Sequence, residues 1–191
     1  MNTPYFGTYE ELVEQAGKFH GDICHGIRIG TRMTMSGLRR IGISDPKGED
    51  RKKLMVFVEI DRCTTDAIMA LTGCRPGKRT MKIRYYGKMA ATFINLETSQ
   101  AARVVIKGNR KPGESDSGEQ PDFATLPEEE LFSITKVEVA LRPEDLPGKP
   151  LSRLPCVKCG ETIMDGREVK SGEQILCIPC SLATDYYRVV G

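Results

Sequence analysis

The cysteine-rich stretch from Cys156 to Cys180 decides the fold of the C-terminal part of this chain. It contains two Cys-x-x-Cys pairs, Cys156-Val-Lys-Cys159 and Cys177-Ile-Pro-Cys180, separated by seventeen residues. Two such pairs supply four thiolates, and a tetrahedral Zn²⁺ binds four thiolates at about 2.3 Å. The spacing therefore predicts a structural zinc site within a zinc ribbon. Two disulfides or redox-active dithiols are the alternative for the same four cysteines.

The residues around the two pairs fit this interpretation. Gly160 follows the first pair and can adopt the positive φ that a zinc knuckle needs, while Pro179 stiffens the second pair. Residues 161–170 lie between the pairs and contain Asp165-Gly166, a dipeptide favoured in two-residue turns. We expect this segment to form a hairpin that turns at Asp165-Gly166.

Length and composition predict one larger domain with a small appendage. The chain has 191 residues, of which 39% are hydrophobic and 28% charged, an ordinary composition for a folded core. We expect a core domain over residues 1–145 and a linker with the zinc ribbon over residues 146–191. No stretch has the layout of a signal peptide or the length of a membrane span. Seven cysteines, an odd number arranged for metal, fit a reducing cytoplasm better than a disulfide scaffold.

Local patterns indicate an α+β core domain. Thr8 and Glu11 form a capping-box pattern before an apolar helical face that includes Leu12 and Phe19. Gly26 and Gly30 stand four residues apart and allow another element to approach closely. Helices and strands come in mixed order, and short turns join adjacent strands, so we expect packed helices and a largely antiparallel sheet. The predicted helices are 8–18, 24–40 and 64–71; the predicted strands are 53–60, 82–86, 89–96, 103–107 and 131–141, with an exposed loop over 107–121.

A second group of metal-binding residue types lies in the core domain. His20 and Cys24 are four apart near the start of a predicted helix, and Cys63 precedes another helix that carries Asp66 one turn inside. A helix start favours a thiolate, and a mixed set of imidazole, thiolate and carboxylate suits an open metal site. Each residue alone has a common structural role as well: buried cysteines fill cores, Asp66 can cap its helix, and His20 can end one.

The order of these motifs resembles a known family. The segments are Phe19-His-Gly-Asp-Ile-Cys-His-Gly-Ile-Arg-Ile-Gly-Thr-Arg-Met33, then Arg62-Cys-Thr-Thr-Asp-Ala-Ile68, then Thr72-Gly-Cys74 with Gly77-Lys78. Together they resemble the FmdE family of formylmethanofuran dehydrogenase proteins over about residues 10–105, and the ribbon resembles one that many members carry.

The resemblance implies an α+β core with a Cys/His pocket, and it implies a homodimer. It also implies that His20, Cys24 and Cys63 are metal ligands or pocket residues, with Asp66, Cys74 and Lys78 beside them. This chain departs from the family motif at two positions, because Asp22 stands where a second His is common and His25 where Pro is common. At this position Asp22 offers an oxygen ligand in place of the imidazole nitrogen. The family name does not fix an activity, since the cofactor-bearing component of that dehydrogenase is a different polypeptide.

The sequence leaves three functions open and does not decide whether the chain is an enzyme. The first is an accessory subunit or small enzyme of one-carbon or oxidoreductase metabolism, with a second divalent metal in the core pocket. Cys63, Asp66 and Lys78 are then the candidate catalytic residues, with Asp66 or Asp22 accepting a proton and Lys78 contacting an anionic group. The second is an interaction or regulatory module that docks a protein partner through the ribbon and senses metal in the core. The third, nucleic-acid binding through the ribbon, is not favoured, because the chain from Pro150 on carries five basic and five acidic residues.

Overall fold

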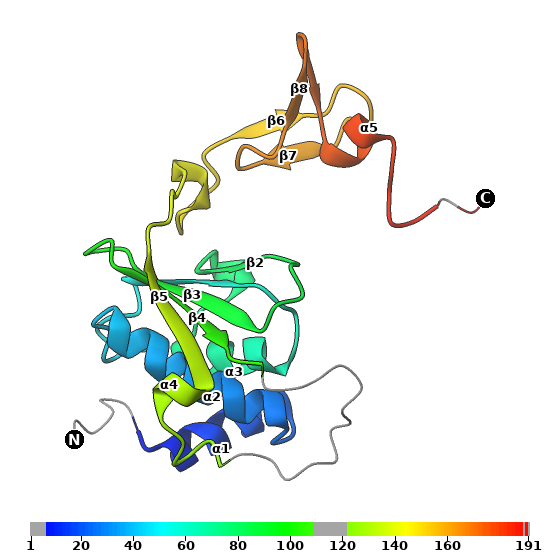
Figure 1. Cartoon of the computed structure of the whole chain (residues 1–191). Helices are drawn as coiled ribbons and strands as arrows, with labels where there is room; N and C mark the ends of the chain where they lie inside the picture. The colour runs from blue at the N-terminus through cyan, green and yellow to red at the C-terminus, as the bar shows by residue number, and fades with distance from the viewer. Residues whose placement is uncertain (1–6, 109–121, 189, 191) are drawn as a thin grey trace. The chain divides into compact units, whose positions relative to one another are not determined.

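The computed structural model of the chain describes residues 7–108, 122–188 and 190. The chain divides into two compact units, Met1–Ala140 and Leu141–Gly191, which we call the core unit and the ribbon unit (Figure 1). The domain boundary predicted between residues 145 and 146 stays a prediction. Among the described residues, no helix combines the length and the apolar character that crossing a membrane requires. Most of the predicted loop over 107–121 lies outside the described residues.

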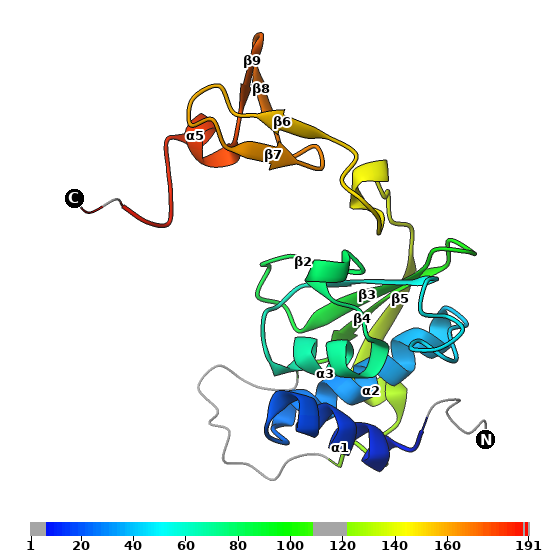
Figure 2. The same cartoon turned by 180° about the vertical axis from the view of Figure 1, so that it is seen from behind.

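The core unit is an α+β fold with a mostly antiparallel sheet, as predicted. The sheet has the strand order β2-β1-β3-β4-β5, and every neighbouring pair is antiparallel except β1 with β2. Three helices lie on one side of this sheet, as both cartoon views show (Figures 1 and 2). The helices are α1 (Tyr9–His20), α2 (His25–Arg40), α3 (Cys63–Thr72) and the short α4 (Glu128–Leu131), with a 3₁₀ turn η1 (Pro76–Lys78); the strands are β1 (Leu54–Val58), β2 (Met81–Ile83), β3 (Ala90–Asn95), β4 (Ala101–Ile106) and β5 (Phe132–Val137).

Helix α1 begins where the sequence predicts and ends two residues later than predicted. The Thr8 side chain accepts a hydrogen bond from the Glu11 N–H at 3.3 Å, and the Glu11 carboxylate accepts one from the Thr8 N–H at 2.9 Å. These two bonds are the predicted capping box. The helix extends to His20 and is closed by Gly21 at φ 100°. Leu12 is buried as expected, but Phe19 is 45% exposed, so its predicted place on the apolar face is wrong.

Two glycines of α2 allow α3 to pack against it at close range. A Cβ added at Gly30 would lie 2.7 Å from the Ala67 Cβ and 2.8 Å from the Thr64 carbonyl oxygen. One added at Gly26 would lie 2.8 Å from the Cys63 Cβ, and the Thr64 hydroxyl donates to the Gly26 carbonyl at 3.2 Å. The expectation of a close approach at these glycines is confirmed. This contact brings the first turn of α3 beside the first turn of α2.

The ribbon unit contains two short antiparallel hairpins and a helix. The first hairpin pairs β6 with β7 and the second pairs β8 with β9. The hairpin predicted to turn at Asp165-Gly166 is therefore wrong, although both residues adopt the positive φ of a tight turn. The strand before this turn pairs instead with β6, across the zinc knuckle that contains Gly160 at φ 77°. The elements are η2 (Pro143–Asp145), β6 (Arg153–Pro155), β7 (Thr162–Met164), β8 (Val169–Ser171), β9 (Gln174–Leu176) and α5 (Ile178–Leu182).

An ion pair on the sheet makes the stability of the core unit depend on pH. Arg103 on β4 donates to both carboxylate oxygens of the buried Glu59, at 2.6 and 2.7 Å. These hydrogen bonds lower the pKa of Glu59 below its ordinary value of 4.5. A group with a lowered folded-state pKa stabilises the fold above its unfolded-state pKa, and this contribution is lost as the pH falls through the folded-state pKa.

We expect Glu59→Gln to lower the free energy of unfolding at pH 7 by about 1.5–3 kcal/mol, the usual range for hydrogen bonds to charged groups. The substitution should also flatten the loss of stability below about pH 4.5, where Glu59 would otherwise take up its proton. Urea unfolding across pH 3–7 measures both effects. Glu14→Gln is the matched control, because its ion pair with Lys18 is exposed and screened by solvent, so its loss should leave the stability almost unchanged. The prediction would be contradicted if Glu59→Gln lost its free energy of unfolding below pH 4.5 as steeply as the wild type.

Candidate metal centres

The four cysteines of the ribbon unit converge on one point. Cys156 and Cys159 lie in the turn between β6 and β7, and Cys177 and Cys180 lie at the start of α5. The four sulfur atoms all lie within 4.8 Å of one another. The sulfurs of Cys159 and Cys177 are 3.9 Å apart, close to the spacing of about 3.8 Å that two ligands of a tetrahedral zinc adopt at 2.3 Å each. The geometry therefore fits a closed four-cysteine zinc site.

The electrostatics of this cluster favour a cation between the sulfurs. The backbone N–H groups of Cys159 and Cys177 lower the pKa of the Cys156 thiol to about 6. A hydrogen bond with the Cys177 thiol raises the pKa of Cys180 to about 12, and burial and the other two cysteines of the cluster act in the same direction. Four thiolates can therefore coexist here only with a positive ion among them. A zinc ion supplies that charge and releases the thiol protons as it binds.

Three helices of the core unit each place one metal-binding side chain at a second cluster. His20 is the last residue of α1, Cys24 precedes the first residue of α2, and Cys63 is the first residue of α3. Their ligand atoms lie within 4.8 Å of one another, and the Cys24 sulfur is 4.0 Å from the Nε2 of His20. Two bonds of about 2.0–2.3 Å to a shared ion fit within these separations. We call these three residues the core cluster.

Asp66 lies directly behind the imidazole of the core cluster. Its Oδ2 is 2.8 Å from the Nδ1 of His20. Asp66 stands one turn after Cys63 on α3, so the same helix supplies the thiol and the carboxylate. A carboxylate that accepts a hydrogen bond from Nδ1 directs the other ring nitrogen toward the cluster and makes that nitrogen a stronger metal ligand. The geometry therefore favours Asp66 as the residue that orients His20 and not as a fourth ligand.

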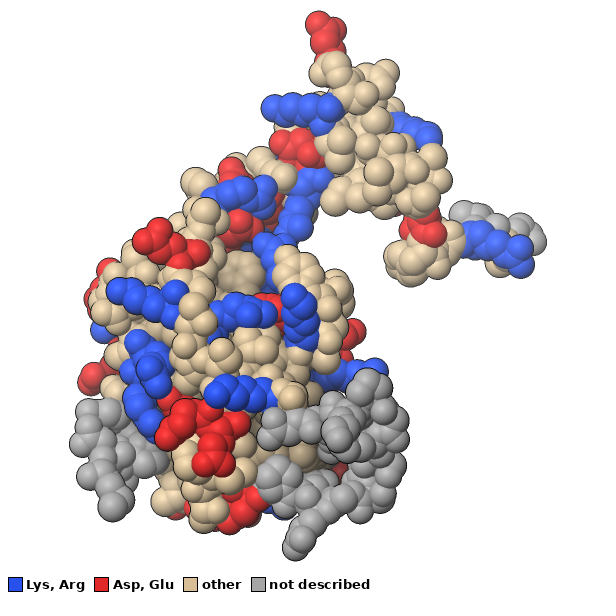
Figure 3. Space-filling view, viewed as in Figure 1, with Lys and Arg blue, Asp and Glu red and all other residues tan. Residues whose placement is uncertain are grey.

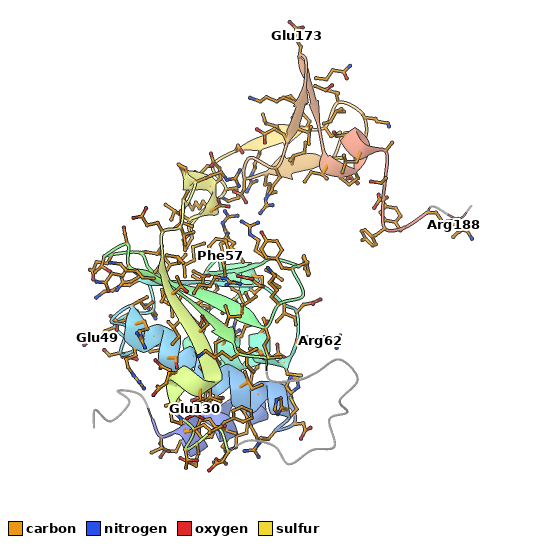
Figure 4. The ribbon with its side chains drawn as sticks, in the orientation of Figure 1. Glu49, Phe57, Arg62, Glu130, Glu173 and Arg188 are labelled. Carbon is orange, nitrogen blue, oxygen red and sulfur yellow. The ribbon has the colours of Figure 1, made fainter. Side chains whose placement is uncertain are left out.

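The contacts of the Cys63 sulfur oppose the predicted preference of Cys63 for the thiolate form. The hydrogen bond with the Cys24 thiol raises the pKa of Cys63, and burial and the nearby Asp66 carboxylate act in the same direction. The start of α3 does not outweigh these contacts. Figure 4 labels Arg62, the residue before Cys63, at this end of the core unit. A bound cation would reverse the balance, since it favours both thiolates at once.

The structure does not bring all the predicted residues to the core cluster. Cys74 is buried and donates to the Leu54 carbonyl at 3.8 Å, and burial raises the pKa of its thiol. It follows the last turn of α3, whereas Cys63 starts this ten-residue helix, which is about 15 Å long. Lys78 lies further along, in η1. Asp22 lies in the exposed turn between His20 and Cys24, where its Oδ1 accepts a bond from the Ile23 N–H at 2.7 Å.

One further histidine adjoins the cluster. His25 follows Cys24 at the start of α2, and its ring meets the ring of Phe123 edge to face with centroids 5.0 Å apart. Its Nδ1 is buried without a hydrogen-bond partner among the described residues. From the sequence, His25 stood out only as a departure from the family motif. The structure shows that it anchors the segment around Phe123 against α2.

The fold and the four-cysteine cluster define a zinc-binding α+β protein. Residues 19–136 match the family model described as "FmdE, Molybdenum formylmethanofuran dehydrogenase operon", and the chain belongs to this family. Residues 149–181 match a second model, described as "Prokaryotic dksA/traR C4-type zinc finger". The predicted resemblance and the structural zinc motif are both confirmed.

Two individual proteins are similar to this chain over most of its length. The crystal structure of a tungsten formylmethanofuran dehydrogenase FmdE-like protein from Syntrophus aciditrophicus has the same fold, with a TM-score of 0.58 and 22% identity over 97% of this chain and 98% of that one. A probable S-adenosyl-L-methionine-binding protein of Archaeoglobus fulgidus is 29% identical over 94% of this chain. This chain spans about half (54%) of the length of that curated relative.

Proposed function

We propose that the core cluster holds one divalent metal ion and that the chain acts as a small metal-dependent enzyme or an accessory subunit associated with oxidoreductase chemistry. The observation that carries this proposal is the convergence of His20, Cys24 and Cys63 within 4.8 Å, from three separate helices. The Asp66 carboxylate at 2.8 Å from the far nitrogen of His20 supports it further. Three protein donors leave a fourth position for water or a substrate oxygen, which is the arrangement of catalytic sites.

The residues around the cluster suit proton transfer beside such a metal. When bound, a divalent ion supplies Lewis acidity: it polarises a carbonyl or lowers the pKa of its water to about 7. Asp66 holds His20 in the orientation that presents Nε2 to the cluster. Asp22 is exposed in the turn between His20 and Cys24, where its Oδ1 accepts a hydrogen bond from the Ile23 N–H, and it takes no part in this proposal. Cys63 stays a candidate for a direct catalytic role.

Metal stoichiometry tests the proposal. Elemental analysis of the purified chain should give two metal ions per chain, one in the ribbon unit and one in the core cluster. Cys63→Ser should remove one of them and leave the ribbon zinc in place. Cys74→Ser is the matched control, because Cys74 belongs to the core unit but lies outside the cluster, and this variant should keep both ions. An unchanged metal count in Cys63→Ser would refute the shared site.

A second prediction concerns the orientation of His20. Asp66→Asn keeps the size of the side chain but removes the negative charge behind the imidazole. We expect the metal affinity of the core cluster to fall about 10–100-fold, which is typical for the loss of a group that orients a ligand. Competition with a chromophoric chelator measures this affinity, and the ribbon zinc serves as the internal control. An affinity within about twofold of the wild type would show that Asp66 does not orient His20.

The alternative function is an interaction or regulatory module in which the core cluster senses metal. Exposed apolar side chains on the ribbon unit support it: Val157 is 61%, Ile178 46% and Leu182 64% exposed. Such side chains suit a protein partner docked on the ribbon. We also propose a homodimer, which light scattering of the purified chain can test. All seven cysteines are free in the structure, which supports our proposal of a reducing cytoplasmic environment.

A further inference from the structure

The most basic segment of the chain belongs to the core unit. Residues 75–88 contain six Lys or Arg residues in fourteen positions and no Asp or Glu. The whole chain has a net charge of only +2, so the remainder is net acidic. Basic and acidic side chains are also separated on the face of the core unit that Figure 3 presents. Basic side chains lie across the middle of this face, and acidic ones gather near α4. Neither the core cluster nor the ribbon zinc uses this segment.

The fold fixes the backbone of this segment at an edge of the sheet. Strand β2 is the edge strand and pairs only with β1 in the sheet. Beyond β2, the Arg84 N–H donates to the Val58 carbonyl at 2.7 Å, and the Tyr86 and Lys88 N–H groups both donate to the Glu59 carbonyl at 3.2 Å. The loop from Arg84 to Lys88 is therefore held to the end of β1 by three backbone hydrogen bonds.

This anchored loop holds two large aromatic side chains in water. Tyr85 is 76% exposed and Tyr86 is 64% exposed. Packing in the core unit does not require either ring, because both leave most of their surface uncovered. Arg84 precedes these two tyrosines in the chain, and its guanidinium stacks on another ring, with its central carbon 5.2 Å from the centroid of the Phe57 ring. This stacking restricts the guanidinium and leaves its charge available at the surface.

We propose that residues 75–88 form a binding surface for single-stranded nucleic acid. In this surface, the bases stack on Tyr85 and Tyr86, and the phosphates contact the exposed cations Arg75, Lys78, Arg84 and Lys88. None of these four side chains forms a salt bridge within the part of the chain that the structure describes, although Lys88 also interacts with the Glu59 carboxylate. Exposed aromatic rings combined with a line of cations are the usual means of binding single strands without sequence preference.

The aromatic pair distinguishes a single strand from other polyanions. A base must leave its own stack before it can lie against a tyrosine ring, so a duplex cannot use this contact. An acidic peptide or a sulfated polysaccharide has no flat base to stack on the rings, so the cations would supply most of its binding. The equal numbers of basic and acidic residues that disfavour nucleic-acid binding are those of the ribbon. The surface formed by residues 75–88 belongs to the core unit. The surface shares no residue with the core cluster, so it stands independently of the proposed metal function.

The test is fluorescence anisotropy of the full-length, zinc-loaded chain with a short labelled oligouridylate, a matching oligothymidylate, a duplex of the same length, and heparin as a polyanion without bases. We expect both single strands to bind more tightly than the duplex, and the tighter of the two identifies RNA or DNA as the natural class. The logarithm of the binding constant should fall against the logarithm of salt with a slope of about −2 to −3, because three or four cations contact phosphates.

The paired variants separate stacking from charge. Tyr85→Ala with Tyr86→Ala should weaken oligonucleotide binding roughly 10- to 100-fold and leave heparin binding unchanged. Arg84→Gln with Lys88→Gln should weaken the binding of the oligouridylate, the oligothymidylate and heparin. The matched control is Tyr186→Ala with Tyr187→Ala, an exposed tyrosine pair in the ribbon unit, and it should bind like the wild type.

Three results overturn the proposal: no binding by the wild type at low salt, duplex binding as tight as single-strand binding, or full affinity in the Tyr85/Tyr86 variant. Cys63→Ser should keep its affinity for nucleic acid. The outcome of this test is therefore independent of whether the core cluster binds a metal.

Discussion

Replacing Cys177 with serine is expected to unfold the ribbon unit and to release its zinc ion. The reason is the small size of its core, since Cys156 and Ile163 are its only hydrophobic residues that are buried among those the structure describes. So little apolar burial cannot offset the conformational entropy that folding removes. Metal binding must supply the difference, on the order of 10 kcal/mol for a structural zinc site. Loss of one ligand should therefore abolish the ordered state of the unit.

The core unit should not respond to this change. We expect Cys177→Ser to lose its dispersed ribbon resonances in NMR spectra and one zinc ion per chain, while the far-ultraviolet circular dichroism of the core unit stays largely intact. Ser181→Ala serves as the control, because Ser181 follows Cys180 on α5 without belonging to the four-cysteine cluster. Because the ligands must be deprotonated, zinc affinity should also fall as the pH drops through the pKa of about 6 of Cys156. A ribbon unit that stays folded in a strong chelator would contradict the prediction.

Gly30→Ala is expected to damage both the stability of the core unit and its metal cluster. The new methyl group would meet the Ala67 Cβ at 2.7 Å and the Thr64 carbonyl oxygen at 2.8 Å. Neither neighbour is the end of a flexible side chain, so the helices α2 and α3 must separate. Overpacking of this kind costs about 1–3 kcal/mol, whereas the better helix propensity of alanine returns at most about 1 kcal/mol. The net effect should be destabilising, and the separation should move Cys63 away from Cys24.

Two measurements check this prediction. Urea unfolding should show a lower free energy of unfolding, and chelator competition should show weaker metal binding at the core cluster with the ribbon zinc unaffected. Gly77→Ala is the control, because a Cβ at Gly77 meets no atom within 4 Å and its φ is ordinary. That variant should be neutral or more stable by up to about 1 kcal/mol, since alanine restricts the unfolded chain. Equal stability of the two variants would show that the helices do not depend on Gly30 for their approach.

Most of the local structure of this chain is encoded in short patterns that the sequence displays. The capping box at Thr8 and Glu11, the long helix to Arg40 and the stop at Gly73 each depend on a few neighbouring residues, and each is present in the structure. The zinc ligands of the ribbon are equally local, because each Cys-x-x-Cys pair forms within a single turn. These features were predictable because their physical cause lies within about one turn of the chain.

The α+β class, the zinc ribbon and the residue types of the core cluster could thus be inferred without coordinates. Which distant residues meet could not be inferred from the sequence. Asp66 contacts His20, whereas Cys74 and Lys78 lie beyond the other end of α3. Tertiary packing also pairs β7 with β6 across the knuckle, although Asp165-Gly166 has the chemistry and the φ values of a tight turn. Strand partners and helix contacts depend on which surfaces can be buried together, and the two glycines of α2 allow the approach that builds the cluster.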